Sequence, residues 1–410
     1  MTAVLPGTTD VPDLFAPEHH DDPYPVYAAL RAAGPLVPYR LDDVPVQLVT
    51  RYEECAEVLT SADWGHGYAE GISPFRDTVA RIPGSFVRMD PPEHGRLRGL
   101  LNKAFMPRQV AQLGPTAAAV VERLLDDALA AGELEVITGL AEPLAAAMVQ
   151  GRLLGIPEED RPGLRAWELA IARGTDPDDL LSADDIRARG EAAVGCVGYF
   201  TELVARRRVE PGEDLLSMLL EGVDAGLLTE AEVVGIALLF LVAGTETSVN
   251  LIANGVLDLL RHPSETALLR ERPDLAPSAV DEVLRHDAPT QFTIRVALRD
   301  TEVGGRRFSR GDGVVVLMAS ASHDELVFDD PTRFDITRYA GPRPARRHLG
   351  FSLGLHYCLG APLARIEAES SFSALVRRTR AITPAFDRVE YLPSLIHRGA
   401  RELPVTLDPA

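Results

Sequence analysis

One long apolar stretch limits most strongly what this chain can fold into. Residues 230–261 fit a single helix, because residues 229–232, T-E-A-E, form a capping box at its start and His262, followed by proline, ends it. About 32 residues at 1.5 Å each give a helix about 48 Å long. Its most apolar run, residues 233–244, is shorter than the ~20 apolar residues of a membrane span, and Glu246 follows it. We therefore expect the central helix of one large core.

Composition agrees with a folded globular protein and excludes several classes. Of the 410 residues, 46% are hydrophobic and 25% are charged, as in ordinary domains. The 61 acidic residues exceed the 41 basic ones, so the net charge is −20, which argues against nucleic-acid binding. The first ten residues lack the features of a signal peptide, and three scattered cysteines suit a reducing compartment. We expect a cytoplasmic protein with no membrane attachment.

Helix and strand signals predict a mainly α fold with a small β region. Helices are expected over residues 51–60, 115–131, 139–154, 161–173, 184–208, 230–261 and 362–379. Another helix should start at Pro91, with Asp90 as its cap. Strands are expected in a hairpin over residues 36–50 and over residues 292–298, 301–303, 306–308 and 314–318. Residues 61–90 should form a long loop, residues 1–20 a flexible arm, and residues 21–410 a single domain.

Residues 351–360, F-S-L-G-L-H-Y-C-L-G, are the most informative stretch for chemistry. Cys358 stands between Gly354 and Gly360, just before a helix that starts near Pro362. Glycine turns let backbone N–H groups point at the sulfur, and the helix dipole favours an anion there. Both effects stabilise a thiolate, which is a suitable axial ligand for haem iron. The alternative is a small buried hydrophobic cysteine, the reading we keep for the other two cysteines.

The pattern F-x-x-G-x-H-x-C-x-G resembles the haem-binding loop of the cytochrome P450 superfamily. The residues that carry it are Phe351, Gly354, His356, Cys358 and Gly360. Together with three further motifs in the expected order, the resemblance covers about residues 20–405. It implies a cytochrome P450 fold with the long helix over a haem b group, Cys358 as the ligand of the haem iron, and O2-dependent monooxygenase activity. One departure is Ser352, where many bacterial members have glycine, and it concerns the conformation of the loop.

Residues 243–247, A-G-T-E-T, lie midway along the long helix. Glycine there costs about 1 kcal/mol relative to alanine, and threonine side chains can bond the preceding turn and open the helix locally. Taken alone, these residues equally fit a threonine bonded to the preceding turn and a glutamate on a solvated face. The motif resembles the acid–alcohol pair of the family, which implies that Glu246 relays protons and Thr247 hydrogen-bonds the oxygen. Ala243 and Gly244 would then border the haem.

Glu282 and Arg285 are spaced i, i+3 in the helical run 278–286, so they share one face. A surface pair of little energetic value has the same spacing. The pair resembles the ExxR motif of the family, which implies that it is buried, completed by an arginine further along the chain, and holds the cysteine loop in place. Arg333 is our first choice for that arginine, and Arg338 the second.

Haem carries two carboxylates, and burying them requires cationic partners. His94 and Arg98 are spaced i, i+4, so they share one helix face. The stretch around them resembles the propionate-binding helix of the family, and Arg295 and His356 match two further propionate partners. The alternative for each of these residues is a surface charge or a histidine with other partners.

Electrons have to come from another protein, because no nucleotide-binding glycine loop and no room for a reductase domain are present. Residues 76–108 carry seven basic and three acidic residues, and Arg343, Arg346 and Arg347 form a second basic cluster. We expect an acidic ferredoxin, itself served by a ferredoxin reductase that takes electrons from NADPH or NADH, to dock there. Scattered solvated arginines are the alternative.

The substrate pocket implied by the resemblance is mostly apolar, which suits a hydrophobic substrate. Its candidate residues are Leu239, Ala243, Thr290, Ile294 and Ile396. The chain looks like actinobacterial members that tailor secondary metabolites, which implies hydroxylation or epoxidation of a polyketide or peptide, free or tethered to a carrier protein, by a monomeric enzyme. The alternatives are an atypical oxidation such as ring coupling, a haem-thiolate sensor without turnover, and a helical protein in which Cys358 is merely packed.

Overall fold

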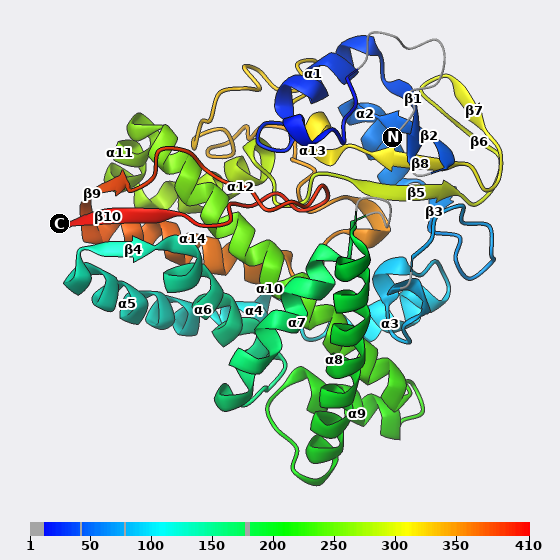
Figure 1. Cartoon of the computed structure of the whole chain (residues 1–410), viewed down its shortest axis with the longest axis horizontal. Helices are drawn as coiled ribbons and strands as arrows, with labels where there is room; N and C mark the ends of the chain where they lie inside the picture. The colour runs from blue at the N-terminus through cyan, green and yellow to red at the C-terminus, as the bar shows by residue number, and fades with distance from the viewer. Residues whose placement is uncertain (1–11, 42, 78, 177–180) are drawn as a thin grey trace.

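The computed structural model of the chain describes residues 12–41, 43–77, 79–176 and 181–410. Figure 1 shows a helical body around α10, with a mixed sheet beside α1 and α2 and a smaller sheet near the C-terminus. The helices are α1 (Tyr24–Ala33), α2 (Tyr52–Thr60), α3 (Glu93–Leu101), α4 (Pro107–Ala111), α5 (Gly114–Ala131), α6 (Glu142–Ala145), α7 (Arg161–Arg173), α8 (Ala183–Val209), α9 (Leu215–Asp224), α10 (Glu230–Arg261), α11 (Pro263–Glu271), α12 (Ala276–His286), α13 (Met318–Ala321) and α14 (Ala361–Arg378). Two π-helical segments, Ile137–Ala141 and Ala146–Leu153, flank α6. The expected mainly α fold is confirmed.

The central helix α10 has the predicted bounds and the predicted cap. The Glu232 backbone N–H donates to Thr229 Oγ1 at 3.2 Å, and the Thr229 N–H donates to the Glu232 carboxylate at 2.8 Å. The helix is unbroken over its 32 residues. By length and hydropathy it could cross a membrane, but 72% of its most apolar window is buried inside the protein. It is therefore packed as a core helix.

The strands form two larger sheets and a hairpin. They are β1 (Leu36–Leu41), β2 (Val44–Val49), β3 (Trp64–Gly65), β4 (Glu133–Glu135), β5 (Thr293–Ala297), β6 (Thr301–Val303), β7 (Arg306–Phe308), β8 (Gly313–Val316), β9 (Thr379–Pro384) and β10 (Pro404–Pro409). The mixed sheet has the order β1-β2-β8-β5-β3, with β2 and β8 parallel. β3 is antiparallel to β5, with Gly65 opposite Val296. This pairing brings the residue after β3, His66, close to Arg295 on β5.

Asp90 does not cap α3, contrary to expectation. Its carboxylate instead accepts the backbone N–H groups of His66 at 2.9 Å and Gly67 at 2.7 Å. The start of α3 is left without a side-chain cap. Asp90 therefore ties the long loop after β3 to the beginning of α3, two segments that the sequence separates by more than twenty residues.

The part of the expected N-terminal arm that the structure describes is packed. Leu14 and Phe15 are buried, and the Phe15 ring meets the ring of Tyr39 on β1 edge to face at 5.5 Å. Residues 1–11 lie outside the described residues. α9, α11, β9 and β10 are elements that the sequence patterns did not predict.

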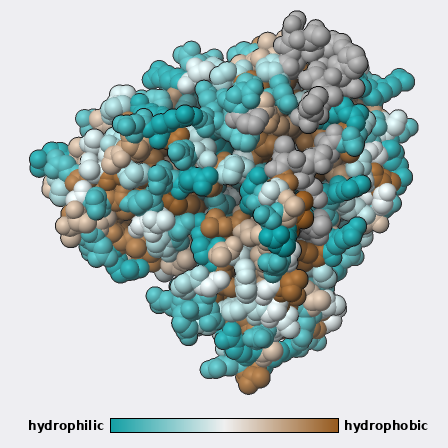
Figure 2. All heavy atoms as spheres, in the orientation of Figure 1, coloured by the Kyte–Doolittle hydropathy of each residue, from teal (hydrophilic) through white to brown (hydrophobic). Residues whose placement is uncertain are grey.

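The surface is a mixture of polar and apolar residues (Figure 2), and the buried apolar residues form three clusters. Figure 2 shows one face of the molecule as a mixture of hydrophilic and hydrophobic residues. The largest apolar cluster lies between α5, α10, α12 and α14, while two smaller clusters lie on either side of the mixed sheet. α10 and α14 approach so closely that a side chain at Gly255 would place its Cβ 2.1 Å from the ring of Phe372.

Candidate active site

The cysteine loop, residues 351–360, is shaped by backbone contacts. The Cys358 N–H donates to the carbonyl oxygen of Phe351 at 3.0 Å and folds the loop back on itself. Gly354 has a φ of 66°, and a side chain there would place its Cβ 2.3 Å from the carbonyl oxygen of Leu59. Only glycine fits both requirements. The loop is thus seated against α2 and directly precedes α14.

The Cys358 side chain is half-buried and faces backbone donors. Burial raises the pKa of the Cys358 thiol, while the N–H groups of Gly360 and Ala361 and the guanidinium of Arg98 act to lower it. These are the donors that the glycines and the helix start predict. Because burial outweighs them, a cation at the sulfur is what would favour the thiolate, as metal coordination does.

Ser352 has a backbone conformation that favours glycine. Its φ is 60°, in the left-handed region, which costs a non-glycine residue about 1–2 kcal/mol. Its Oγ is buried and has no hydrogen-bond partner among the described residues. The departure noted in the sequence therefore adds local strain to the loop.

Glu282 and Arg285 of α12 form a fully buried ion pair, with Arg285 Nη2 2.8 Å from Glu282 Oε1 and both side chains 0% exposed. The expectation that Arg333 completes the pair is not met. Arg338 does so instead, because its Nε lies 3.1 Å from Glu282 Oε2. The Arg333 side chain is 62% exposed beside Asp335, and only its carbonyl oxygen accepts a bond from Arg285.

The neighbouring residue on α12, Asp281, contacts one residue before the cysteine loop and one residue after it. His348 Nε2 lies 2.9 Å from the Asp281 carboxylate, and Arg365 of α14 forms an ion pair with it. Burial by itself would raise the pKa of Asp281, but His348 and Arg365 hold it below its ordinary value. The Arg365 guanidinium also lies over the Phe351 ring, 5.2 Å from its centroid. No sequence motif pointed to this second set of contacts.

Beside the loop, histidines with unpartnered nitrogens converge. His94 of α3 is fully buried, and neither of its ring nitrogens has a hydrogen-bond partner. Its ring centroid lies 4.5 Å from that of His356, whose Nε2 is also buried and unpartnered. Arg98, one turn after His94, donates to the carbonyl oxygen of Tyr357 at 2.7 Å.

Arg295 of β5 adds a buried cation to this group. It is 4% exposed and donates to the carbonyl oxygen of Ile294 at 2.8 Å and to Thr293 Oγ1 at 3.0 Å. Burial lowers the pKa of Arg295 to about 10, and the nearby charge of Arg88 acts in the same direction. Over the described ranges of the chain, neither Arg98 nor Arg295 forms an ion pair. His66, which the sequence motifs did not select, lies beside Arg295 and His356.

We call these residues the cationic pocket, namely His66, His94, Arg98, Arg295 and His356. Buried guanidinium groups without acids are costly unless an anion enters, and unpartnered imidazoles need an acceptor or donor. The two carboxylates of haem b fit this requirement, next to a cysteine that can ligate iron. Within the described residues, no group of three or more His, Cys, Asp or Glu side chains is arranged to hold a metal ion, so the iron would bring its own nitrogen donors.

The acid–alcohol motif lies on α10, where its two members behave differently. Glu246 is buried and forms an ion pair with Arg165 of α7 at 3.4 Å, so it does not lie on a solvated face. Thr247 Oγ1 donates to the carbonyl oxygen of Ala243 at 2.7 Å, the bond to the preceding turn that a structural threonine makes. The expected local opening is absent, because the helix is continuous here.

Packing against a neighbouring segment accounts for Gly244. A side chain there would place its Cβ 3.1 Å from Val149 in the second π-helical segment. Ala243, one residue earlier, is exposed. A larger residue at position 244 would therefore need the Val149 side chain to shift by a few tenths of an ångström.

Arg165 is shared by three carboxylates, which we call the acidic cluster: Glu142, Glu168 and Glu246. Burial disfavours the charge of Arg165, but Glu246, Glu142 and Glu168 together raise its pKa. Burial raises the pKa of Glu168 to about 7, although Arg165 and hydrogen bonds from Gln150 and Thr245 act to lower it. Three acids around one arginine leave surplus negative charge, so this cluster can hold a proton.

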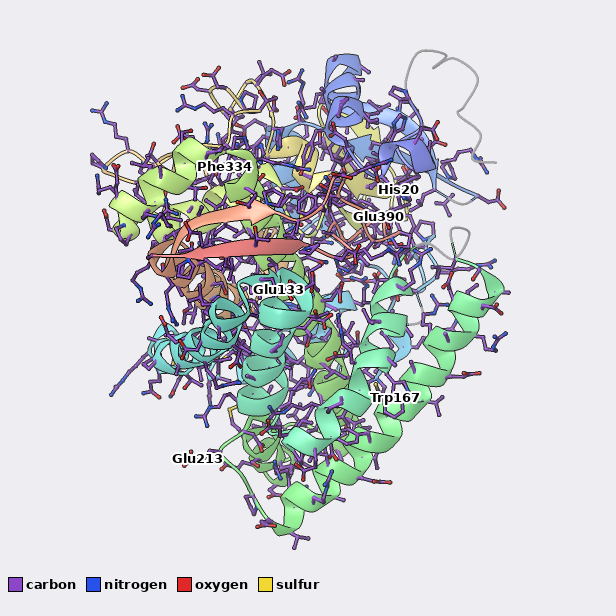
Figure 3. The ribbon with its side chains drawn as sticks, turned by 60° about the vertical axis from the view of Figure 1, so that its left-hand side comes forward. His20, Glu133, Trp167, Glu213, Phe334 and Glu390 are labelled. Atoms are coloured by element: carbon purple, nitrogen blue, oxygen red, sulfur yellow. The ribbon has the colours of Figure 1, made fainter. Side chains whose placement is uncertain are left out.

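The acidic cluster belongs to the tightly packed contact of α7 with α8 and α10. Figure 3 shows Trp167 on α7 beside the long α8. A side chain at Gly195 of α8 would place its Cβ 2.5 Å from the Trp167 ring, so the two helices are in close contact. Glu168 is the next residue after this tryptophan and is 1% exposed.

The candidate substrate residues fall into two groups. Gln291 N–H donates to the carbonyl oxygen of Ile396 at 2.9 Å, and Thr290 pairs with His397, so the chain before Ile294 lies against Ile396. Leu239 and Ala243 form the other group, one turn apart on α10. Asp176, just after α7, accepts the N–H groups of residues 395 and 396 and ties α7 to the first group.

Much of the expected basic surface is neutralised by ion pairs. Arg346 pairs with Glu53 at 2.7 Å, Arg88 with Asp77, and Arg96 with Glu93 and Glu232. Arg98 belongs to the cationic pocket. Within the two expected basic clusters, residues 76–108 and 343–347, the exposed basic side chains for which the described residues provide no ion pair are Arg76, Arg81, Lys103, Arg108, Arg343 and Arg347. Arg347 lies over the ring of Tyr357, 4.3 Å from its centroid, and thus borders the cysteine loop.

Comparisons with known proteins cover nearly the whole chain. The model of the family described as Cytochrome P450 matches residues 202–391. The biotin biosynthesis cytochrome P450 of Bacillus subtilis is 36% identical over 389 residues, which are 94% of this chain and 96% of the relative. The 6-deoxyerythronolide B hydroxylase of Saccharopolyspora erythraea is 36% identical over 415 residues, 98% of this chain and all of the relative. The crystal structure of P450BioI with an acyl carrier protein ligated to hexadec-9Z-enoic acid has a TM-score of 0.86 and 36% identity, over 95% of this chain and 100% of that one.

Proposed function

The chain belongs to the cytochrome P450 family and is a monooxygenase, and from that premise we propose that it inserts one atom of O2 into a hydrophobic secondary-metabolite scaffold with electrons from a ferredoxin. The observation that carries the proposal is the cationic pocket beside Cys358. Within the described residues, Arg98 and Arg295 form no ion pair and the imidazoles have unpartnered nitrogens, and the two carboxylates of haem b would supply the anion. Hydroxylation and epoxidation are the two outcomes that we propose.

Each part of the site has a distinct task in this proposal. When bound, haem supplies the reductive activation of O2. Cys358 would hold its iron through a thiolate that the N–H groups of Gly360 and Ala361 and the charge of Arg98 favour. The buried contacts of Glu282 and Asp281 keep the loop that carries Cys358 in one position. The remaining work of this chain is to place the substrate and to deliver protons.

Proton delivery is the task that we propose for Glu246. Its carboxylate can hold and release a proton, and Arg165 at 3.4 Å orients it from α7. The Thr247 hydroxyl donates to the carbonyl oxygen of Ala243, so it has to turn away from this carbonyl to donate toward the site. In this proposal, the hydrogen bond from Thr247 to the Ala243 carbonyl has to break during each turnover.

For the substrate we propose a polyketide or peptide scaffold with a large apolar surface, bound between the two groups of pocket residues. Leu239 and Ala243 would contact it from α10, and Thr290, Ile294 and Ile396 from the opposite segments. One relative is named for hydroxylation of 6-deoxyerythronolide B, and another was crystallised with an acyl carrier protein. Both facts support an oxidised biosynthetic scaffold, either free or tethered to a carrier protein.

The redox partner that we propose is an acidic ferredoxin, served by a ferredoxin reductase in the cytoplasm. The unpaired basic side chains around the cysteine loop, Lys103, Arg108, Arg343 and Arg347, support docking on this side by electrostatic steering. Arg347→Glu should raise the KM for ferredoxin about threefold to tenfold at low salt, and the difference should shrink at high salt. Arg307→Glu on β7, where the side chain is 91% exposed, is the control. Equal KM values for the two variants would contradict this docking site.

The reduced, CO-bound absorption spectrum tests the cofactor. We expect the red-shifted Soret band of a thiolate-ligated haem in the wild type and its loss in Cys358→Ser. Cys196→Ser, which alters another buried cysteine on α8, is the matched control and should keep the band. A wild type without bound haem, or a Cys358→Ser variant with an unchanged band, would refute the proposed function.

The substrate class is tested by the spin-state shift of the ferric enzyme. Macrolactones, lipopeptides and fatty acids are titrated as free compounds, and acyl chains are also presented on a carrier protein. We expect a shift to high spin with at least one polyketide or peptide scaffold. A shift confined to small polar ligands would contradict the substrate proposal without touching the cofactor.

A further inference from the structure

The cationic pocket contains one buried group to which the cytochrome P450 motifs assign no role, His66. It is 2% exposed, and its Nε2 is buried without a hydrogen-bond partner. We propose that His66 is an additional binding residue for a haem carboxylate, donating a hydrogen bond to it beside Arg295. The inference rests on the proposed function, because it requires that this chain binds haem.

The backbone around His66 is built to hold this residue in one place. Gly65 precedes it, and a side chain there would place its Cβ 2.2 Å from the Asp90 carboxylate. Gly67 follows it with a φ of 68°. The two oxygens of Asp90 accept the N–H groups of His66 and Gly67. The histidine is thus locked between two glycines by a carboxylate from the start of α3.

The same contacts turn the Asp90 carboxylate toward the backbone, and in the described part of the chain it forms no ion pair with Arg98 or Arg295. Each of its oxygens already accepts a backbone N–H, at 2.9 Å and 2.7 Å. The ring of His66 lies 4.9 Å from the ring of His356, and it stacks on Tyr68 at 6.1 Å. Because no acceptor among the described residues bonds His66 Nε2 or His356 Nε2, the acceptor that we propose among His66, His356 and Arg295 is a carboxylate of a bound group.

The protonation state of His66 agrees with a neutral donor. Burial lowers the pKa of His66 well below its ordinary value, and the charges of Arg295 and Arg88 act in the same direction. A neutral imidazole carries one N–H, so it can donate a single hydrogen bond to a carboxylate. The charge of that carboxylate would be balanced by Arg295, while His66 adds directional contact.

The rate of haem loss to excess apomyoglobin tests the proposal, because it does not depend on turnover. Removing a hydrogen bond to a charged group should speed haem loss about tenfold or more in His66→Phe and His66→Leu. His66→Gln keeps an N–H donor and should stay within about threefold of the wild type. The reduction potential of the haem should fall in His66→Phe and His66→Leu, because an unbonded carboxylate favours the ferric state, and it should be restored in His66→Gln.

His323→Gln is the matched control, since His323 is a buried histidine whose Nε2 bonds the carbonyl oxygen of His286 on α12 and which lies outside the pocket. Wild-type rates of haem loss in His66→Phe and His66→Leu would overturn the proposal, as would equal losses in His66→Gln and His66→Leu. Unchanged haem loss with weakened binding of a fatty acid would assign the imidazole to substrate and also overturn it. Failure of the proposed function appears separately, as a wild type that binds no haem.

Discussion

The cationic pocket and the acidic cluster are two buried groups of charge with opposite excess. Among the described residues, Arg98 and Arg295 of the pocket form no ion pair with an acid, whereas the cluster holds three carboxylates around Arg165. Guanidinium groups do not lose their protons in proteins, so only a bound anion can balance the pocket. Carboxylates can take up a proton, so the cluster can balance itself from solvent. In the proposed function, the cationic pocket binds an anionic cofactor, and the acidic cluster takes up and releases protons.

The largest effect should come from removing an uncompensated cation. In Arg295→Leu a haem carboxylate would be buried without its charge partner, which costs about 3–5 kcal/mol, or a loss of haem affinity of about 100-fold or more. Titration of the haem-free protein with haemin measures it. Arg299→Leu, an exposed arginine paired with Asp63, is the control. Equal haem affinities in the two variants would show that the pocket is not an anion site.

A second large effect should follow from Glu246→Gln in the acidic cluster. Without a carboxylate that exchanges protons, product formation should slow about 100-fold, with a larger solvent isotope effect. Haem affinity should stay unchanged, which separates the two regions. Glu142→Gln removes another carboxylate that contacts Arg165, and we expect a change of less than about threefold. If both variants were equally slow, the role would belong to Arg165 and its charge balance rather than to Glu246.

A smaller effect concerns the pH dependence of folding. The pKa of Glu168 is raised from the ordinary 4.5 to about 7, so between these values the folded state binds more protons than the unfolded state. Stability therefore falls as the pH rises through this range, by about 3 kcal/mol. Glu168→Gln should flatten that part of the curve of Tm against pH, measured between pH 5 and 8. If the curve of Glu168→Gln were as steep as that of the wild type, a group other than Glu168 would cause this pH dependence.

The smallest effect should come from a cation that already has an acid. Arg88 borders the cationic pocket and pairs with Asp77 at 2.5 Å. Because its charge is balanced within the protein, Arg88→Leu should weaken haem binding less than about threefold, measured by the same haemin titration as Arg295→Leu. A loss as large as that of Arg295→Leu would mean that charge near the pocket, and not pairing, determines affinity.

The central helix could be predicted from the sequence because the residues that begin and end it act locally. The capping box at Thr229 and the stop at His262 are both in place, and the helix between them has the predicted bounds. The same holds for the hairpin of β1 and β2 and for the start of α14. Each of these elements is specified by residues a few positions apart, which is the range over which caps, turns and periodicity act.

Three misses near the cysteine loop depend on contacts between distant segments. Arg333 and Arg338 look alike in sequence, and only the folded chain shows that the second reaches Glu282. The sequence predicts Asp90 as a cap because it precedes a helix, but its carboxylate accepts hydrogen bonds from the loop after β3. His66 has no motif around it, and the pairing of β3 with β5 alone brings it beside Arg295. Such partners follow from topology, which no short pattern contains.

Asp281 and Glu282 are consecutive residues, so their side chains leave α12 about 100° apart. One fastens His348 and Arg365, and the other fastens Arg338, so a single turn of helix clamps the chain on both sides of the cysteine loop. A rotation of α12 would stretch the contacts of Asp281 and Glu282 in different directions, so these contacts oppose the rotation. Any breathing motion that admits a bulky substrate has to arise elsewhere. We expect it at contacts that do not involve α12, such as the bonds of Asp176, just after α7, to the backbone N–H groups of residues 395 and 396.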